Sequence, residues 1–433
     1  MPTLAIIMIV RNESACLESC LESVAAIADE IIIGDTGSSD DTADVARRFT
    51  PKVLDIVWRN DFSAARNAVL RHTTADWLLH MDADECLDPE SAARIRQTVD
   101  ADGNGSDAFE VTLANYCDEP RAWRWTPSRP GDPFARGHAG YLAVPLLRLF
   151  RNGRGFEYRE PVHENITESV LELGGVVGRL DVLIHHYGYA PANAQKAVRY
   201  LSILEAKAAA RPDDAKALHD LAEQLVSMDR ADEAEPLCRR VLERDPLDLP
   251  AATTLANLLL NRGDTEEASH VLETLERHGI APPHVLTALA AVDIREGRLD
   301  AATARLDGAL TQAPNHILAR LYVARAADLA GHPPEAQRHL ELACGFAPGL
   351  PEPVARLRAL RFRLEADNTL RSGDHRMALA LYVQALKEDP EDPLVHWGLA
   401  RTLDGLGDPR RAAESRERAL LLAPSLAATV HEP

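Results

Sequence analysis

The sequence predicts two kinds of structure in one chain: an α/β domain followed by an all-α solenoid. The first half alternates short apolar runs with amphipathic helical stretches, which is typical of a parallel sheet with helical crossovers. The second half repeats its glycines, prolines and alanines at intervals close to 34 residues. A chain of 433 residues is long enough for roughly two to three domains.

Four runs in the first half are predicted strands: Leu4–Val10, Glu30–Asp35, Val53–Val57 and Trp77–Asp82. Their apolar character is nearly continuous, as in strands that are buried on both faces. The helices expected around them are Glu13–Ile27, Ala43–Phe49 and Phe62–Arg71, with Ser39 and Asp40 as the N-cap of the second. This order favours a parallel sheet with right-handed crossovers. After Asp100 the alternation loosens, and irregular loops are expected there.

The second half has the period of a helical repeat. Its turn glycines follow one another in steps of 34, 34, 42 and 34 residues, at Gly263, Gly297, Gly331, Gly373 and Gly407. Two helices joined by a tight turn every 34 residues are the signature of tetratricopeptide repeats, which bury their apolar faces only by stacking. About six repeats are expected from Asp213 to Pro424. The 42-residue step predicts an insertion or a lengthened first helix in the fifth repeat.

These patterns give a predicted domain organisation. Residues 1–192 form the α/β domain, and residues 213–433 form the repeats. The segment between them, residues 193–212, is strongly helical and is predicted to join the two parts.

Composition excludes several classes of function. Lysine and arginine number 47 against 67 aspartate and glutamate, a net charge of −20, so no nucleic-acid partner is expected without a local basic patch. The six cysteines include no Cys-x-x-Cys pair, which disfavours a zinc cluster or a disulfide framework. The run Leu4–Val10 falls far short of the ~20 residues that span a membrane, and no signal peptide precedes it. We expect a cytoplasmic protein without a membrane span.

Polar residues follow the predicted strands at the edge where parallel sheets bind ligands. In chain order they are Arg11, Asn12, Glu13, Asp35, Asp82 and Asp84. Asp82 and Asp84 can hold a hard divalent cation whose open positions take diphosphate oxygens. Asp35 can accept hydrogen bonds from a base or ribose, and Arg66 offers a guanidinium to phosphate. The plain alternatives are a turn at Asp35, a surface or ion-paired arginine at Arg66, and acidic residues that merely precede a helix near Asp88.

Four segments together resemble the family 2 glycosyltransferases of the GT-A fold. They are residues 10–13 (VRNE), 35–42 (DTGSSDDT), 58–67 (WRNDFSAARN) and 82–85 (DADE), in the family's order and spacing. The resemblance implies a UDP-sugar donor bound by Arg11, Asn12, Glu13, Asp35, Arg66 and Asp82. It also implies that Asp82 and Asp84 form the motif for the diphosphate and a divalent metal, Mn or Mg. Two later segments, Glu160–Asn165 and Ile184–Tyr189, resemble members joined to tetratricopeptide repeats, including enzymes that glycosylate peptides.

The later segments offer further candidates for chemistry. Glu164 can remove the acceptor's proton as a general base in a single inverting displacement, and His163 is the rival base. His186 can complete the metal shell because imidazole suits Mn and other transition ions, and His185 competes for this role. The alternative for all four is a structural or surface position.

The sequence therefore predicts an enzyme that moves a sugar from a nucleoside-diphosphate donor to a peptide, protein or glycan acceptor. Tetratricopeptide stacks form concave grooves that bind peptides, so the repeats are expected to recruit the acceptor or a second subunit, which would give a homodimer. The alternative is a non-catalytic interaction scaffold, in which the repeats bind partners and the first domain binds a nucleotide-sugar without turnover or binds nothing.

Overall fold

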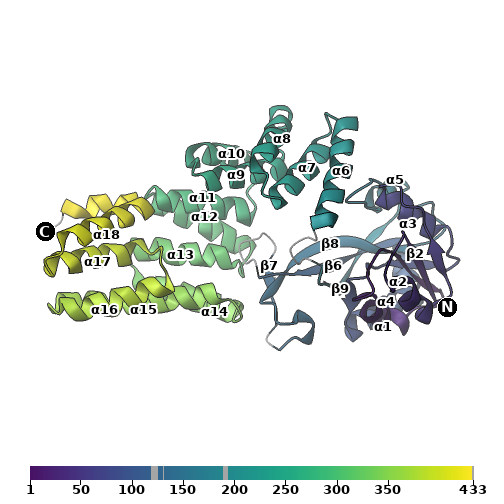
Figure 1. Cartoon of the computed structure of the whole chain (residues 1–433), viewed down its shortest axis with the longest axis horizontal. Helices are drawn as coiled ribbons and strands as arrows, with labels where there is room; N and C mark the ends of the chain where they lie inside the picture. Colours follow the sequence, from purple (N-terminus) through teal and green to yellow (C-terminus); the bar gives the residue numbers. More distant parts are fainter. Residues whose placement is uncertain (119–124, 130, 189–193, 432–433) are drawn as a thin grey trace. The chain divides into compact units, whose positions relative to one another are not determined.

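The structure, a computed structural model, describes residues 1–118, 125–129, 131–188 and 194–431 of the chain (Figure 1). Two compact units divide it. The first comprises Met1–Cys117 and Gly131–Leu237, and the second comprises Asp118–Pro130 and Cys238–Pro433. Tyr189 and the predicted domain boundary between residues 192 and 193 lie outside the described residues.

The first unit begins with alternating strands and helices. In order these are β1 (Leu4–Val10), α1 (Leu17–Ala25), β2 (Glu30–Asp35), α2 (Thr42–Phe49), β3 (Val53–Asp55), α3 (Phe62–Leu70) and β4 (Trp77–His80). The pairs β1–β2, β1–β4 and β2–β3 are all parallel. The four predicted strands are confirmed: β1 and β2 have the predicted bounds, and β3 and β4 end two residues early.

The rest of the α/β domain differs from the prediction. It contains β5 (Glu85–Leu87), α4 (Pro89–Asp100), η1 (Asp102–Gly105), β6 (Ala108–Tyr116), η2 (Pro133–Ala135), β8 (Gly140–Arg151), α5 (Thr167–Glu172) and β9 (Val177–His186). The strand order is β3-β2-β1-β4-β8-β6-β9-β5. Because β8 runs antiparallel to β4 and β6, and β5 antiparallel to β9, the sheet is mixed and the expectation of a wholly parallel sheet is wrong beyond β4.

Strands β6, β8 and β9 lie beyond Asp100, where the alternation loosens and the sequence pattern gave bounds for no strand; the loops expected there, at residues 103–106 and 120–133, fall outside these three strands. Burial is uneven along β8 and β9, with intermediate residues through the middle of β8 and the first half of β9. In the sequence, Pro145 and Arg148 interrupt the apolar run of β8, and Arg179 and Asp181 interrupt that of β9, so neither strand has an unbroken apolar run. They carry the second half of the site described below.

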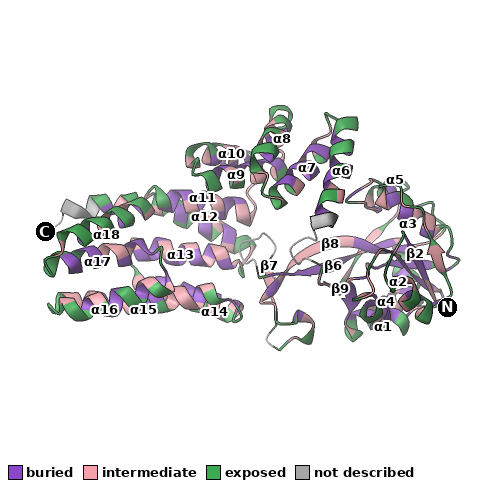
Figure 2. Cartoon of the chain, viewed as in Figure 1, coloured by how far each residue is buried: buried purple, intermediate pink, exposed green. Residues whose placement is uncertain are grey.

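Helices cover both faces of this sheet, because successive residues of β1 point to opposite sides. Leu4 and Ile6 belong to different cores from Ala5 and Ile7. The first core includes buried residues of α1, α2 and α4, and the second includes residues of α3 and α5. Figure 2 shows the buried residues along the strands between these helices.

Local capping sets where two of these helices begin. Asp61 caps α3, where its carboxylate accepts a hydrogen bond of 2.8 Å from the Ala64 amide. The predicted N-cap of α2 is wrong: the N-cap is Asp41, which makes no side-chain capping bond. Asp40 instead binds the Thr42 amide and hydroxyl from outside the helix.

The first unit also contains α6 (Ala194–Ala210) and α7 (Ala215–Ser227), which pack against each other. Helix α8 (Ala231–Arg244) spans the division between the units, and the short strand β7 (Trp125–Pro127) falls in the second.

The second unit is a stack of helices. They are α9 (Leu249–Arg262), α10 (Thr265–Arg277), α11 (Pro283–Arg295), α12 (Leu299–Gln312), α13 (Ile317–Leu329), α14 (Pro333–Phe346), α15 (Pro351–Arg371), α16 (His375–Glu388), α17 (Pro393–Gly405), α18 (Pro409–Leu422) and η3 (Pro424–His431). Consecutive pairs pack together, and the repeated alanines Ala268, Ala302, Ala336, Ala378 and Ala412 are fully buried.

The 42-residue step has a direct structural cause. Helix α15 has 21 residues, whereas α11 and α13 have 13 each. Of the two possibilities left by the sequence, the structure shows the lengthened first helix. No helix in the described ranges has the length and apolar character needed to cross a membrane.

Candidate active site

The turns after β1 and β2 interlock. Asn12, with a left-handed backbone (φ 57°), donates its amide to Ser38 Oγ (3.0 Å) and accepts the Ser39 amide at Oδ1 (2.7 Å). The Glu13 amide donates to Thr42 Oγ1 (2.8 Å). These bonds hold the segment Arg11, Asn12 and Glu13 against the loop that follows Asp35, as the meeting of two parallel strand ends requires.

Asp35 lies at the end of β2, next to Val10 of β1. Its Oδ1 accepts the Gly37 and Ser38 amides at 2.9 and 2.7 Å. Asp35 therefore forms a turn, which the sequence left as the alternative to a ligand-binding role. This turn fixes the Asp35 carboxylate at the strand edge. The turn uses Oδ1 only, so a ligand role for Oδ2 is compatible with it.

Asp82 is surrounded by cationic and polar groups. Arg66 Nη2 donates to Asp82 Oδ1 (2.8 Å), His80 Nε2 lies 3.2 Å from the same oxygen, and Arg148 Nη2 lies 3.4 Å from Oδ2. Burial alone would raise the pKa of Asp82, but Arg66, His80 and Arg148 outweigh it and hold that pKa well below its usual range. Asp82 is therefore an anion whose two oxygens are already partnered.

Arg66 joins two candidates that are far apart in the sequence. Its Nε donates to Glu164 Oε1 (2.6 Å) while its Nη2 holds Asp82. Arg66 is 7% exposed, and helix α3 carries it into the site. Of the plain alternatives for Arg66, the structure excludes the surface position and shows the ion-paired arginine; a role in binding phosphate stays a prediction. Asp82, Arg66 and Glu164 form one hydrogen-bonded chain.

Arg148 and Glu85 complete this group, although neither was predicted. Arg148 Nη2 donates to Glu85 Oε1 (2.8 Å), and Glu85 Oε2 accepts the Asp82 amide (2.7 Å). Burial, opposed by Arg148 and supported by Asp82, raises the pKa of Glu85. The sequence held one signal: Arg148 interrupts the apolar run 146–150 (LLRLF), and arginine is rarely buried in such a run unless it is paired. We call the five side chains the Arg66 cluster: Arg66, Asp82, Glu85, Arg148 and Glu164.

Asp84 pairs with His186 at the end of β9. Asp84 Oδ2 lies 3.3 Å from His186 Nε2, and His186 Nδ1 lies 2.5 Å from Asn115 Oδ1. The Asn115 oxygen favours a proton on Nδ1, so the neutral ring carries its lone pair on Nε2, and the protonated ring presents an Nε2–H to Asp84. Burial would lower the pKa of His186, but the Asp84 carboxylate outweighs it, so that pKa is raised.

The backbone also approaches this pair closely. A Cβ at Gly188 would lie 2.0 Å from Asp84 Oδ2 and 2.8 Å from His186 Nε2, so only glycine leaves the pair open. A carboxylate and an imidazole facing one space are suitable ligands for Mn²⁺. Within the described ranges, no group of three or more His, Cys, Asp and Glu side chains gathers for a metal ion.

The structure separates the competing histidines. His185 points to the opposite face of the sheet from His186, where its Nδ1 lies 2.8 Å from the Tyr116 hydroxyl and its Nε2 lies 3.4 Å from Asp88. It is 2% exposed and structural in its contacts. His163 is exposed. Glu164, not His163, is brought to Arg66.

Comparisons with known proteins agree with this geometry. The family model "Glycosyl transferase family 2" matches residues 5–163, and tetratricopeptide repeat models match 225–292, 317–341 and 369–428. A TPR repeat-containing protein of Synechococcus elongatus is 30% identical over 325 residues, 72% of this chain and 67% of that protein. The SPbeta prophage-derived glycosyltransferase SunS of Bacillus subtilis is 26% identical over 329 residues, 72% of each chain.

Among solved structures, glucosyl-3-phosphoglycerate synthase from Mycobacterium tuberculosis, in complex with Mg²⁺ and uridine diphosphate, aligns with 47% of this chain and 77% of that one. The TM-score is 0.32 and the sequence identity is 17%.

The mixed sheet and the acidic residues at its strand ends define the class of GT-A glycosyltransferases. The chain belongs to glycosyltransferase family 2, and tetratricopeptide repeats follow its transferase domain.

Proposed function

We propose that this glycosyltransferase uses a UDP-sugar donor and a divalent cation, Mn or Mg, and transfers the sugar with inversion. The observation that carries the proposal is the Asp84–His186 pair beside the Arg66 cluster, at the carboxyl ends of β1, β2 and β4. In open sheets this edge is where nucleotides bind. The donor class follows from the family to which the chain belongs.

The residues divide the work of donor binding. Asp84 and His186 would hold the cation, which needs only one or two protein ligands when phosphate oxygens fill its other positions. When bound, the cation would neutralise charge on the diphosphate leaving group. The partnered oxygens of Asp82 favour a role in shaping the donor site over a place in the metal shell. Arg11, Asn12, Glu13 and Asp35 would surround the base and ribose.

Glu164 is the proposed general base. An acceptor hydroxyl would lose its proton to Glu164 as its oxygen bonds to the anomeric carbon, and the bond to the diphosphate would break on the opposite side, which inverts the configuration. Arg66 occupies Oε1 of Glu164, so Oε2 is the oxygen left for the proton. His163 stays the rival base.

The acceptor is proposed to be a peptide or protein bound in the concave groove of the repeats, because stacked helical repeats form such grooves. A glycan acceptor is the second choice. Cytoplasmic location and a homodimer through the repeats also remain predictions.

Calorimetry with UDP tests the donor site. The full chain is titrated with UDP in Mn²⁺ and then in chelator, alongside Asp84→Asn. We expect binding that needs the ion and weakens by about ten- to a hundredfold in the variant, the range for damaged metal sites. No binding to the intact chain would favour the non-catalytic scaffold.

The chain offers a matched control for this experiment. Asp88 and His185 form a second Asp–His pair, 3.4 Å apart, on the opposite face of the sheet. Asp88→Asn preserves the N-cap of α4, since asparagine caps helices as well as aspartate does. UDP affinity should be unchanged in Asp88→Asn. Equal losses in the two variants would contradict a specific role for Asp84.

A further inference from the structure

The loop that carries Glu164, residues 159–165, is held by the transferase domain on one side. Arg159 and Asn165 exchange two backbone hydrogen bonds of 3.0 and 3.2 Å, which close the loop. The Phe62 amide of α3 donates to the Pro161 carbonyl (3.0 Å), and Arg66 of the same helix binds Glu164. We call residues 159–165 the Glu164 loop.

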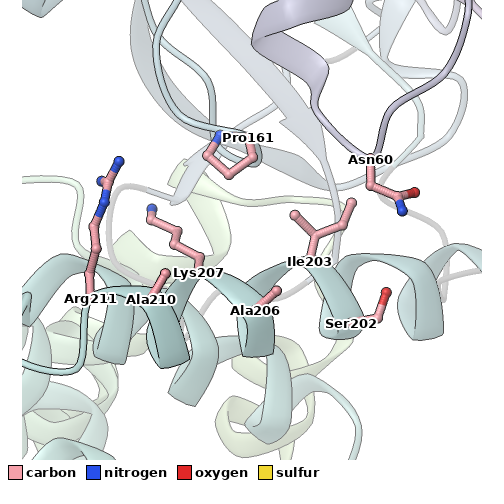
Figure 3. Close-up of a pocket in the computed structure, with 8 residues that line it drawn as sticks. All are labelled: Asn60, Pro161, Ser202, Ile203, Ala206, Lys207, Ala210 and Arg211. Atoms are coloured by element: carbon pink, nitrogen blue, oxygen red, sulfur yellow. The ribbon is translucent and has the colours of Figure 1, made fainter.

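Helices α6 and α7 hold the same loop from another direction. Lys207 of α6 donates to Asp220 Oδ2 of α7 (2.9 Å), and its ammonium also lies 2.9 Å from Glu160 Oε2, off the hydrogen-bond direction, as an ion pair. Arg211 Nη1 donates to Glu160 Oε1 (2.6 Å). Figure 3 shows Lys207 and Arg211 extending from α6 toward the segment that carries Pro161.

Lys207 is an unusual residue for a connecting helix because it is 5% exposed. Lysine is seldom buried unless it is paired. Burial would lower the pKa of Lys207, but Glu160 and Asp220 outweigh it and raise that pKa. Burial would likewise raise the pKa of Glu160, yet Arg211 and Lys207 lower it. The group is therefore an ionised triad, in which Lys207 and Asp220 are buried and Glu160 is half-buried.

Glu160 needs these contacts because its backbone is strained. Its φ is 75°, in the left-handed region that is disfavoured for any residue with a Cβ. Such a conformation persists where the surrounding structure over-determines it, and it is common at functional sites. Lys207 and Arg211 supply that constraint through the Glu160 carboxylate.

Helix α6 also contacts the element that carries Arg66. The Tyr200 ring stacks on Phe62 with 5.4 Å between centroids and 11° between planes. Phe62 lies one turn before Arg66 on α3. Helix α6 therefore touches both the Glu164 loop and the helix that binds Glu164.

We infer that α6 is a working part of the transferase domain, and that Lys207 is a positioning residue that holds the Glu164 loop, and with it Glu164, against Arg66. The inference rests on the proposed function only for its catalytic consequence. A cavity of about 320 Å³ beside Lys207, lined by Pro161, Ile203 and Ala206 among others, leaves the loop room to move once the ion pair is lost (Figure 3).

Hydrogen exchange of the full chain tests the positioning directly. Two variants release the loop: Lys207→Met removes the ammonium, and Glu160→Gly removes the carboxylate while glycine accepts the left-handed backbone. In Glu160→Gly, Lys207 keeps Asp220 as its partner, so folding is preserved. We expect the amides of Phe62, Arg159 and Asn165 to exchange at least tenfold faster in both variants.

Asp229→Gly is the matched control. Asp229 is also a non-glycine residue with a left-handed backbone (φ 58°), it is exposed, and it lies just beyond α7. Exchange in the Glu164 loop should be unchanged in this variant. Lys207→Arg, which keeps the positive charge, should retain most of the protection that Lys207→Met loses. Unchanged loop exchange in both Lys207→Met and Glu160→Gly would overturn the inference.

Turnover separates positioning from mere stabilisation. With UDP-glucose as the probe, we expect kcat for UDP release per folded molecule to fall tenfold or more in Glu160→Gly, while affinity for UDP stays within threefold. Faster exchange in the Glu164 loop with a normal kcat would overturn the claim that turnover depends on the position of this loop. Absence of UDP binding by the wild-type chain would instead refute the proposed function, and loop exchange would still decide the positioning claim.

Discussion

Each compact unit contains a buried group of arginines and carboxylates, and the two groups differ in what they face. The Arg66 cluster lies at strand ends of the first unit, where the Asp82 side chain is 32% exposed. In the second unit, Arg325 binds Asp389 and Asp392 at 2.9 and 3.1 Å. Arg363 binds Asp328 and Asp367 there. We call these six side chains the Arg363 cluster.

The Arg363 cluster is closed to solvent except at Asp367, whose side chain is 31% exposed. The side chains of Arg363 and Asp328 are each 8% exposed, and the cavity beside the cluster holds about 20 Å³, about enough for one water molecule. Its members come from α13, α15 and the segment before α17, so it connects successive helices of the stack. The two clusters therefore differ in their place in the fold: the Arg66 cluster lies at strand ends, where sheets of this kind bind ligands, and the Arg363 cluster joins helices of the repeats.

Removal of Arg66 should have the largest effect, because the half-buried carboxylates of Asp82 and Glu164 then lose their shared, buried partner. We expect Arg66→Met to lose about 3–5 kcal/mol of stability, as for other broken buried pairs, and to abolish UDP binding. Scanning calorimetry and UDP titration measure the two effects. Arg66→Lys, which keeps the charge, should retain more stability than Arg66→Met. Wild-type UDP affinity in Arg66→Met would remove this cluster from the donor site.

Removal of Arg363 should cost as much stability without touching the donor site. Arg363→Met leaves Asp328 and Asp367 without their cationic partner, so the free energy of unfolding should again fall by about 3–5 kcal/mol. The loss should be confined to the thermal transition of the repeats. UDP affinity should stay within twofold of wild type. Loss of UDP binding in this variant would mean that the two clusters are not independent.

The Arg363 cluster should also make the repeats pH-sensitive. Burial, opposed by Arg363, raises the pKa of Asp328 to about 6. Between about pH 4 and pH 6 the folded chain then binds more protons than the unfolded chain, so stability falls as pH rises through this window. A pKa shift of this size changes the free energy of unfolding by about 2–3 kcal/mol across the window. Denaturation at several pH values should show this slope, and Asp328→Asn should flatten it.

The smallest effect is expected at an exposed carboxylate in the turn after β2. Hydrogen bonds from Thr42 lower the pKa of Asp40 to about 2, against a small opposing effect of burial. The contribution of ionised Asp40 to the free energy of unfolding is therefore present above about pH 4 and is lost as the pH falls toward 2. Because Asp40 is exposed, we expect only a few tenths of a kcal/mol. Acid unfolding of Asp40→Asn, compared with wild type, measures this contribution. A loss of more than 1 kcal/mol in the free energy of unfolding would contradict the argument that solvent screens the interactions of Asp40.

The sequence by itself determined the local features of this protein. The bounds of β1 and β2 and the helical repeats follow from apolar runs and a fixed period, which can be seen in the sequence alone. The polar ends of β1, β2 and β4 could be located in the same way. Their roles came from family resemblance.

Only the tertiary structure decided which of these groups meet. Arg66 and Glu164 are 98 residues apart, and no local pattern records that pairing. His185 and His186 are neighbours, yet strand alternation sends one to Asp88 and the other to Asp84. Lys207 reads as an ordinary helical lysine until folding buries it against Glu160. Burial and long-range pairing set the chemistry of an ionisable group, and both exist only once the chain has folded.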